Sequence, residues 1–251
     1  MEEIAQTLLD LFLALSRVGT ALMMLPVTGP QSLGAFGRLL LAVPFAYFAV
    51  ATGSVSGAGD LSAAMMIKEA CIGLLLGFVW ALPFHALQSV GHIVDFQSGL
   101  TFAQSLDPLT EEQSSISANL FFYVFAAIFM TAGGMMMMID TLVTSYAIWP
   151  VQSFLPRLSA ATLLALIYET NGLFTLSILF AAPAAAVLLL IEFAVGVVSS
   201  TAQQLGVEQF ILPLKIWLSW AVLLLCLPYI VQRVTSLLPE LVYFSQKVLE
   251  M

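Results

Sequence analysis

Residues 70–94 read ACIGLLLGFVWALPFHALQSVGHIV, a run without a single Asp, Glu, Lys or Arg. About 20 mostly apolar residues are enough for an α-helix to cross the hydrocarbon core of a bilayer. At least five of six such uncharged runs reach that length, and the other five runs are Val18–Gly37, Leu39–Gly59, Gln113–Ile139, Thr170–Ile191 and Ile216–Gln232. The pattern predicts an all-α, multi-pass helical membrane protein.

Composition supports the same class. The chain has 251 residues, of which 61% are hydrophobic and 9% are charged, whereas soluble domains carry about 25% charged residues. The net charge of −8 argues against nucleic-acid binding, which needs clustered Lys and Arg. The acidic start MEEIAQTLLD is unlike a basic signal peptide, so we expect the first apolar segment to be retained.

Six helical stretches are expected within one helical membrane domain spanning residues 1–251. Gly- and Pro-rich turns separate them. A bend is expected at Pro83 and an interruption at residues 170–172. The predicted ranges are about 4–25, 38–51, 60–95, 114–149, 163–200 and 213–249.

Charged residues and prolines interrupt several of these stretches. Lys68 and Glu69 lie at the start of the third, Asp140 lies in the fourth and Glu192 in the fifth. A charge near the bilayer centre costs about 2.5–3.5 kcal/mol, so such residues usually face protein or water. We therefore expect helices packed against partners rather than a free-standing bundle.

No site for catalysis, a cofactor or a metal is predicted. The sequence has no H-E-x-x-H, G-x-S-x-G or P-loop pattern. His85, His92 and Asp95 share one helix face and have the residue types of a two-His, one-carboxylate site. A polar face directed at a partner explains them equally, so an intramembrane enzyme remains only an alternative.

The run MTAGGMMMMID, residues 130–140, has two interpretations. Met135, Met136, Met137 and Met138 can be ordinary helix packing, or a deformable contact beside a protein-conducting path, because methionine adapts its shape. Gly133 and Gly134 are expected to let another backbone approach closely, as small residues do at membrane helix interfaces. The spacing of Gly73 and Gly77 predicts the same for the third helix.

The segment FQSGLTFAQSLDPLTEEQSS, residues 96–115, is polar and rich in turn residues. Gly99 supplies flexibility and Asp107-Pro108 favours a turn. Irregular backbone at membrane depth survives only when buried in protein or lining an aqueous cavity. The segment is either a surface loop with an amphipathic turn or a re-entrant plug, whose apolar side chains would be Phe96, Leu100, Phe102 and Leu106.

Three motifs in order resemble the T (FliR-like) component of the type III secretion export apparatus. The first is GGMMMMIDTLVTSYAIWP, residues 133–150, through its Gly pair and through Ser145, Tyr146, Trp149 and Pro150. The loop at residues 97–108 matches through Gln97, Gly99, Asp107 and Pro108, and residues 202–215 match through Gln204, Leu205, Val207, Pro213 and Lys215. The family often has Pro-Gln-Leu-Asn at residues 203–206, where this chain has Gln-Gln-Leu-Gly. The Gly pair resembles the injectisome branch more than the flagellar one.

The resemblance implies a non-catalytic subunit of a protein export gate in the bacterial inner membrane. One T subunit would complete a ring with several copies of the R and S components, with the export-switch protein as a further partner and unfolded proteins as substrates. Residues 96–115 would contribute the pore plug. Gln204, Leu205, Pro213 and Lys215 would lie at subunit interfaces, and Lys215 is expected to pair with a carboxylate on a neighbouring helix or subunit. The alternatives are a flagellar gate subunit and a small-molecule or ion transporter.

Overall fold

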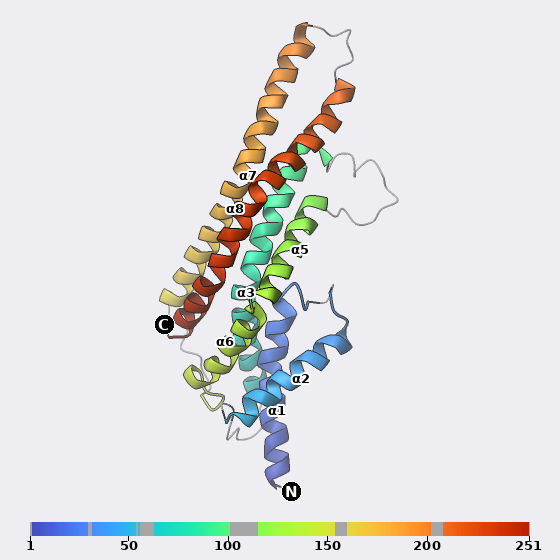
Figure 1. Cartoon of the computed structure of the whole chain (residues 1–251). Helices are drawn as coiled ribbons and strands as arrows, with labels where there is room; N and C mark the ends of the chain where they lie inside the picture. Colours follow the sequence, from blue (N-terminus) through green and yellow to red (C-terminus); the bar gives the residue numbers. More distant parts are fainter. Residues whose placement is uncertain are drawn as a thin grey trace. The chain divides into compact units, whose positions relative to one another are not determined.

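The computed structural model describes residues 2–29, 32–53, 55, 63–100, 115–153, 160–201 and 208–250. Helices make up almost all of these residues (Figure 1). They are α1 (Glu2–Met24), α2 (Ala35–Ala51), α3 (Ala63–Ser98), α5 (Ile116–Thr131), α6 (Gly134–Ile148), α7 (Ala160–Thr201) and α8 (Glu208–Glu250).

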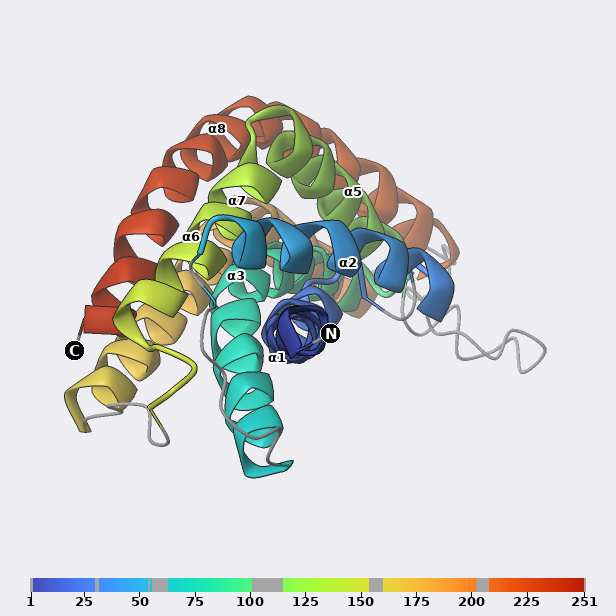
Figure 2. The ribbon, with the colours of Figure 1, turned by 90° about the horizontal axis from the view of Figure 1, so that it is seen from below.

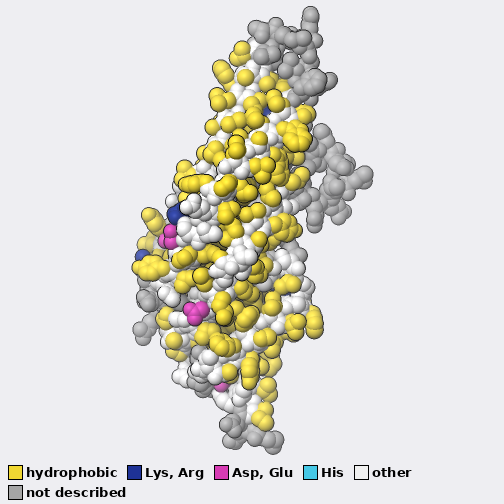
Figure 3. All heavy atoms as spheres, viewed as in Figure 1, with side chains coloured by type: hydrophobic (Ala, Val, Ile, Leu, Met, Phe, Trp, Pro, Cys, Tyr) yellow, Lys and Arg dark blue, Asp and Glu magenta, His cyan; other side chains and the backbone are white. Residues whose placement is uncertain are grey.

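Four of these helices contain stretches long and apolar enough to cross a membrane: Gln6–Met24, Ala63–Ser98, Leu164–Val197 and Pro213–Lys247. Helices α5 and α6 together make a fifth candidate, bent by 67°. On the face shown in Figure 3, hydrophobic side chains predominate and charged ones are few and scattered. The prediction of an all-helical, multi-pass membrane protein is confirmed.

The chain forms two compact units, and the boundaries between them fall inside four helices. The first unit holds residues 1–82, 129–170 and 237–251, and the second holds residues 83–128 and 171–236. Within α3 the boundary lies between Leu82 and Pro83. Each unit is described by itself below.

In the first unit, α1 and α3 lie side by side (Figure 2). They approach closely because two glycines of α3 face α1. A Cβ atom on Gly73 would lie 2.1 Å from the Arg17 carbonyl oxygen, and one on Gly77 would lie 2.6 Å from that of Ala21. The close approach lets the Thr20 hydroxyl donate to the Ala70 carbonyl at 3.1 Å. The predicted role of this glycine pair is confirmed.

Helices α1, α2 and α6 share an apolar core in the same unit. Its buried members are Leu13, Ala14, Ala46, Ala49, Val55, Tyr146 and Val151. Small alanines on α1 and α2 allow the helices to pack tightly, as is usual between membrane helices. Two of its members, Tyr146 and Val151, also contact the polar cluster described in the next section.

In the second unit, α3 packs against the start of α5. A Cβ atom on Gly91 would lie 2.1 Å from the Ala118 nitrogen, so the two backbones nearly touch. The rings of Phe84 and Phe125 lie edge to face, with centroids 4.3 Å apart. The Asp95 carboxylate accepts the Ser117 backbone N–H at 3.0 Å and the Ser115 hydroxyl at 2.6 Å. Asp95 therefore caps α5 from another helix.

Two expectations about the continuity of helices are wrong. The fourth stretch is not one helix, because Gly133 adopts a left-handed conformation (φ 78°) that ends α5 and starts α6. Glycine permits this conformation at little steric cost. The fifth stretch has no interruption at residues 170–172, since α7 runs from Ala160 to Thr201. The Thr170 hydroxyl in this region donates to the Leu166 carbonyl of the same helix at 2.7 Å. The polar side chain therefore has a hydrogen-bond partner without a break in the helix.

Candidate functional site

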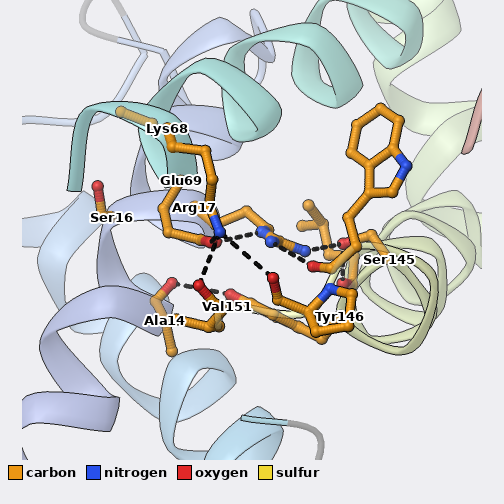
Figure 4. Close-up of polar contacts among 12 residues, drawn as sticks. Ala14, Ser16, Arg17, Lys68, Glu69, Ser145, Tyr146 and Val151 are labelled. Carbon is orange, nitrogen blue, oxygen red and sulfur yellow. Dashed lines mark hydrogen bonds and ion pairs between the residues drawn. The ribbon is translucent and has the colours of Figure 1, made fainter. Parts of the chain in front are cut away.

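A buried arginine organises the first unit. Arg17, on α1, has a relative exposure of 0%. Its Nε atom donates to Glu69 Oε2 of α3 at 2.6 Å, and its Nη1 atom donates to the Ser145 hydroxyl of α6 at 2.8 Å. Its Nη2 atom donates to the Trp149 carbonyl at 3.0 Å (Figure 4). One guanidinium therefore joins three segments that lie far apart in the sequence.

Lys68 extends this cluster to the turn after α6. Its Nζ atom lies 2.7 Å from Glu69 Oε1. It also donates to the carbonyls of Pro150, Val151 and Ser153, at 3.3, 2.9 and 2.9 Å. A cation suits this place because it lies beside the C-terminal end of α6, where the helix dipole is negative.

The aromatic ring of Tyr146 lies against the Arg17 guanidinium. The Arg17 Cζ atom lies 4.0 Å from the centre of the Tyr146 ring, a cation–π distance. The phenol hydroxyl donates to the Ala14 carbonyl at 3.2 Å, which ties α6 to α1 a second time (Figure 4). We call Arg17, Lys68, Glu69, Ser145 and Tyr146 the ionic cluster.

The contacts of the ionic cluster hold three helices, α1, α3 and α6, in position relative to one another. Two cations are balanced by one carboxylate and by backbone carbonyls, and the Glu69 side chain is fully buried. Removing one member of a buried ion pair costs about 3–5 kcal/mol, because its partner is left uncompensated. The arrangement fixes where α6 ends relative to α1 and α3. It offers no nucleophile paired with a base.

The predicted motif residues at 145–150 converge on this cluster. The side chains of Ser145 and Tyr146 contact Arg17, whereas Trp149 and Pro150 contribute backbone carbonyls.

The methionine run of α6 has one packed face and one open face. Met138 is fully buried, whereas Met136 is 72% exposed.

Within the described part of this chain no other backbone comes close to Gly133, so the predicted close approach at the Gly133–Gly134 pair stays a prediction. The Cβ position of Gly133 is open and its role is the turn, because only glycine adopts that conformation readily. At Gly134 a Cβ atom would lie 2.4 Å from the Phe129 ring, so the close neighbour there is a side chain rather than a backbone.

Lys215 has the predicted carboxylate partner on a neighbouring helix. Its Nζ atom lies 2.5 Å from Glu192 Oε1, which joins α8 to α7 in the second unit. The lysine side chain is 13% exposed and the glutamate is 50% exposed. Pro213 is exposed on the same helix, while Gln204 and Leu205 lie outside the described residues.

Of the predicted plug segment, only residues 96–100 and Ser115 are described. Phe96 is 64% exposed, and Gly99 (φ 81°) ends the regular part of α3. The Gln97 Oε1 atom is buried without a hydrogen-bond partner. Phe102, Leu106, Asp107 and Pro108 lie outside the described residues.

The alternative metal triad is not assembled. His85 and His92 are exposed, whereas Asp95 is buried and its two oxygens are bonded to Ser115 and Ser117. Across the described ranges, no group of three His, Cys, Asp or Glu residues is placed to hold a metal ion.

Arg17 was missed by sequence reasoning. Lys68, Glu69, Asp140 and Glu192 drew attention as charges inside apolar stretches, and Arg17 has the same signal, standing between LFLALS and VGTALMML. The expectation that such charges face protein is confirmed for Lys68 and Glu69, which are buried.

The comparisons with known proteins agree with the motifs. A family model described as "Bacterial export proteins, family 1" matches residues 8–241. The chain is 32% identical over 217 residues to "Yop proteins translocation protein T" of Yersinia pestis, covering 84% of this chain and 83% of the relative. It is 33% identical over 189 residues to "Surface presentation of antigens protein SpaR" of Shigella flexneri, covering 71% and 72%. It is 29% identical over 246 residues to "Flagellar biosynthetic protein FliR" of Bacillus subtilis, covering 93% and 95%. The chain therefore belongs to family 1 of the bacterial export proteins, the family of the T (FliR-like) export component that its motifs resemble.

Proposed function

We propose that this chain is the T subunit of an injectisome export gate in the bacterial inner membrane. It would complete a ring with R and S components and help to close a channel for unfolded proteins. Family membership supports the general role, and relatives named for translocation and for flagellar biosynthesis both match. We prefer the injectisome branch for this chain because of its Gly133–Gly134 pair, and the flagellar branch is the second candidate.

The observation that best supports assembly with other subunits is an exposed carboxylate on an apolar membrane span. Glu192 lies within the candidate span Leu164–Val197 and is 50% exposed despite its lysine partner. Only 22% of the most apolar window of that span is buried. Such a charge is costly against lipid, so neighbouring protein or water is expected to cover it. A transporter with a water-filled path would satisfy the same requirement.

The experiment for assembly is native mass spectrometry. The tagged chain is purified in mild detergent from cells that express its genomic neighbours. One copy bound to several copies of other small hydrophobic proteins supports the gate. A lone chain or a homo-oligomer, with those neighbours demonstrably expressed, would favour the transporter.

The pore-closing role is proposed for Phe102 and Leu106. Their segment leaves α3 at Gly99, and its far end at Ser115 is bonded to Asp95. Both ends of the segment are thus attached to the C-terminal end of α3, which would hold a plug in place. Replacing both residues with Ser should raise small-ion leakage through an assembled gate. Unchanged leakage in a secretion-competent gate would rule out their sealing role.

Branch assignment needs a separate test in cells. Expression of this chain in mutants lacking the corresponding subunit should restore effector secretion in an injectisome host. Restored motility in a flagellar host, without restored effector secretion, would assign the flagellar branch instead.

A further inference from the structure

An apolar cavity of about 530 Å³ lies between α2 and α6, beside the turn at Gly133. Its lining residues are Phe48, Ala132, Gly133, Met136, Met137, Ile139, Asp140 and Val143. All of them belong to the first unit, and we call the cavity with these residues the α2–α6 groove. Met136 is 72% exposed and Phe48 is 53% exposed, so the groove is open to the outside.

Asp140 is the one charged residue of this lining. It stands one helical turn after Met136, on the same face of α6. Within the described part of the chain, its carboxylate makes no hydrogen bond or ion pair. The cations of the neighbouring ionic cluster, Arg17 and Lys68, are engaged with Glu69 and with carbonyls. A carboxylate on an apolar helix normally pairs with another group or faces water.

Where the structure describes them, the cations of this chain do not pair with Asp140: Arg38 of α2 forms no ion pair with it, and Arg157 lies outside the described residues. Residues 101–114, which lie outside the described ranges, contain Asp107, Glu111 and Glu112 and no Lys or Arg. The whole chain carries 15 acidic residues against 7 Lys and Arg. As the source of a cation for Asp140, the excess of acidic residues therefore favours a different protein over residues 101–114 and over a second copy of this chain.

The apolar lining of the α2–α6 groove indicates which kind of segment that protein would present. A helix lying on α6 would meet Met136 and Met137, whose flexible thioether side chains adjust to the shape of a partner. Phe48 supplies a flat apolar surface on the opposite side of the groove. We propose that the α2–α6 groove receives an apolar helix of a partner subunit, and that a lysine or arginine on this helix pairs with Asp140. This inference rests on the proposed assembly and adds the surface and the chemistry of one contact.

The first test is site-specific photo-crosslinking in membranes containing the full set of subunits. A benzophenone amino acid replaces Met136 and, as a control, Ile167, which is exposed on α7 in the same unit. The expected result is an adduct from position 136 to an apolar peptide of another subunit, near a Lys or Arg. Adducts only to lipid, or only to a second copy of this chain, would overturn the proposal.

The second test reverses the charge. Asp140→Lys should reduce recovery of the crosslinked subunit with the tagged chain by about tenfold or more, since like charges at an interface oppose binding. Asp140→Asn, which keeps the shape, should reduce it less. Replacing the identified basic residue of the partner by Asp should restore recovery with Asp140→Lys, and Glu169→Lys serves as the matched charge reversal on α7. Normal recovery with Asp140→Lys, or no rescue by the swap, would overturn the pairing.

These outcomes are separable from failure of the proposed function. If native mass spectrometry shows a hetero-oligomer but position 136 contacts only lipid, the groove inference fails and the gate assignment stands. If no hetero-oligomer forms, the gate assignment fails with it.

Discussion

Two sets of opposite charges lie within the apolar helices, and the chain covers them differently. In the ionic cluster, Arg17 and Glu69 are both fully buried, and the remaining donors meet a hydroxyl and carbonyls. In the second unit, Lys215 is nearly buried but its partner Glu192 is half exposed. The first set is complete within one chain, whereas the second leaves a carboxylate edge uncovered. One region of the chain therefore satisfies its charges internally, whereas the other leaves a carboxylate exposed.

The largest effect is expected from Glu69→Gln. This change leaves Arg17 and Lys68 buried without their counter-charge, at a cost of about 3–5 kcal/mol. We expect a large fall in the thermal unfolding midpoint and in the detergent-solubilised yield. Replacing Arg17, Lys68 and Glu69 together with Met should recover much of the loss, because burying no charge is often as stable as burying a charged cluster. A single Glu69→Gln variant as stable as wild type would show that the cluster is not the fixed point of the first unit.

Sequence predicts the helices of this chain better than their contacts. Long uncharged runs mark the spans because the bilayer sets their length, and the spacing of Gly73 and Gly77 identified a real helix interface. The ionic cluster was not predicted as a unit. Arg17 meets Glu69 across 52 positions and Ser145 across 128, and no local pattern encodes such distances. The bend at Gly133 was missed because adjacent glycines suit both close packing and a left-handed turn.

The next effect concerns the packing under the ionic cluster. Gly73→Ala would place a methyl group 2.1 Å from the Arg17 carbonyl oxygen, so α1 and α3 must separate. Overpacking of this kind costs about 1–3 kcal/mol. Gly172→Ala is the matched control, since nothing lies within 4 Å of its Cβ position. That change should be neutral or stabilising by about 0.5–1 kcal/mol, because alanine favours a helix. Equal unfolding midpoints for the two variants would contradict the interface.

A smaller and local effect is expected from Asp95→Ala. The variant removes the acceptor for the Ser117 backbone N–H and hydroxyl. Loss of a helix cap costs about 0.5–2 kcal/mol. Hydrogen exchange should accelerate at the first amides of α5 and stay unchanged in α6. Uniform acceleration across both helices would indicate general destabilisation rather than loss of a cap.

The smallest effect in the isolated chain is expected from Glu192→Gln, which tests directly whether the second unit relies on neighbouring protein to cover its charges. Water or detergent already screens half of this carboxylate, so the pair should contribute less than about 1 kcal/mol to stability. In an assembled complex the same side chain would be enclosed, and its removal would leave Lys215 facing protein without a counter-charge. The variant should therefore lower the dissociation temperature of the complex more than the unfolding midpoint of the chain alone. Equal shifts in both measurements would mean that assembly does not cover this pair, and the second unit would then be as self-contained as the first.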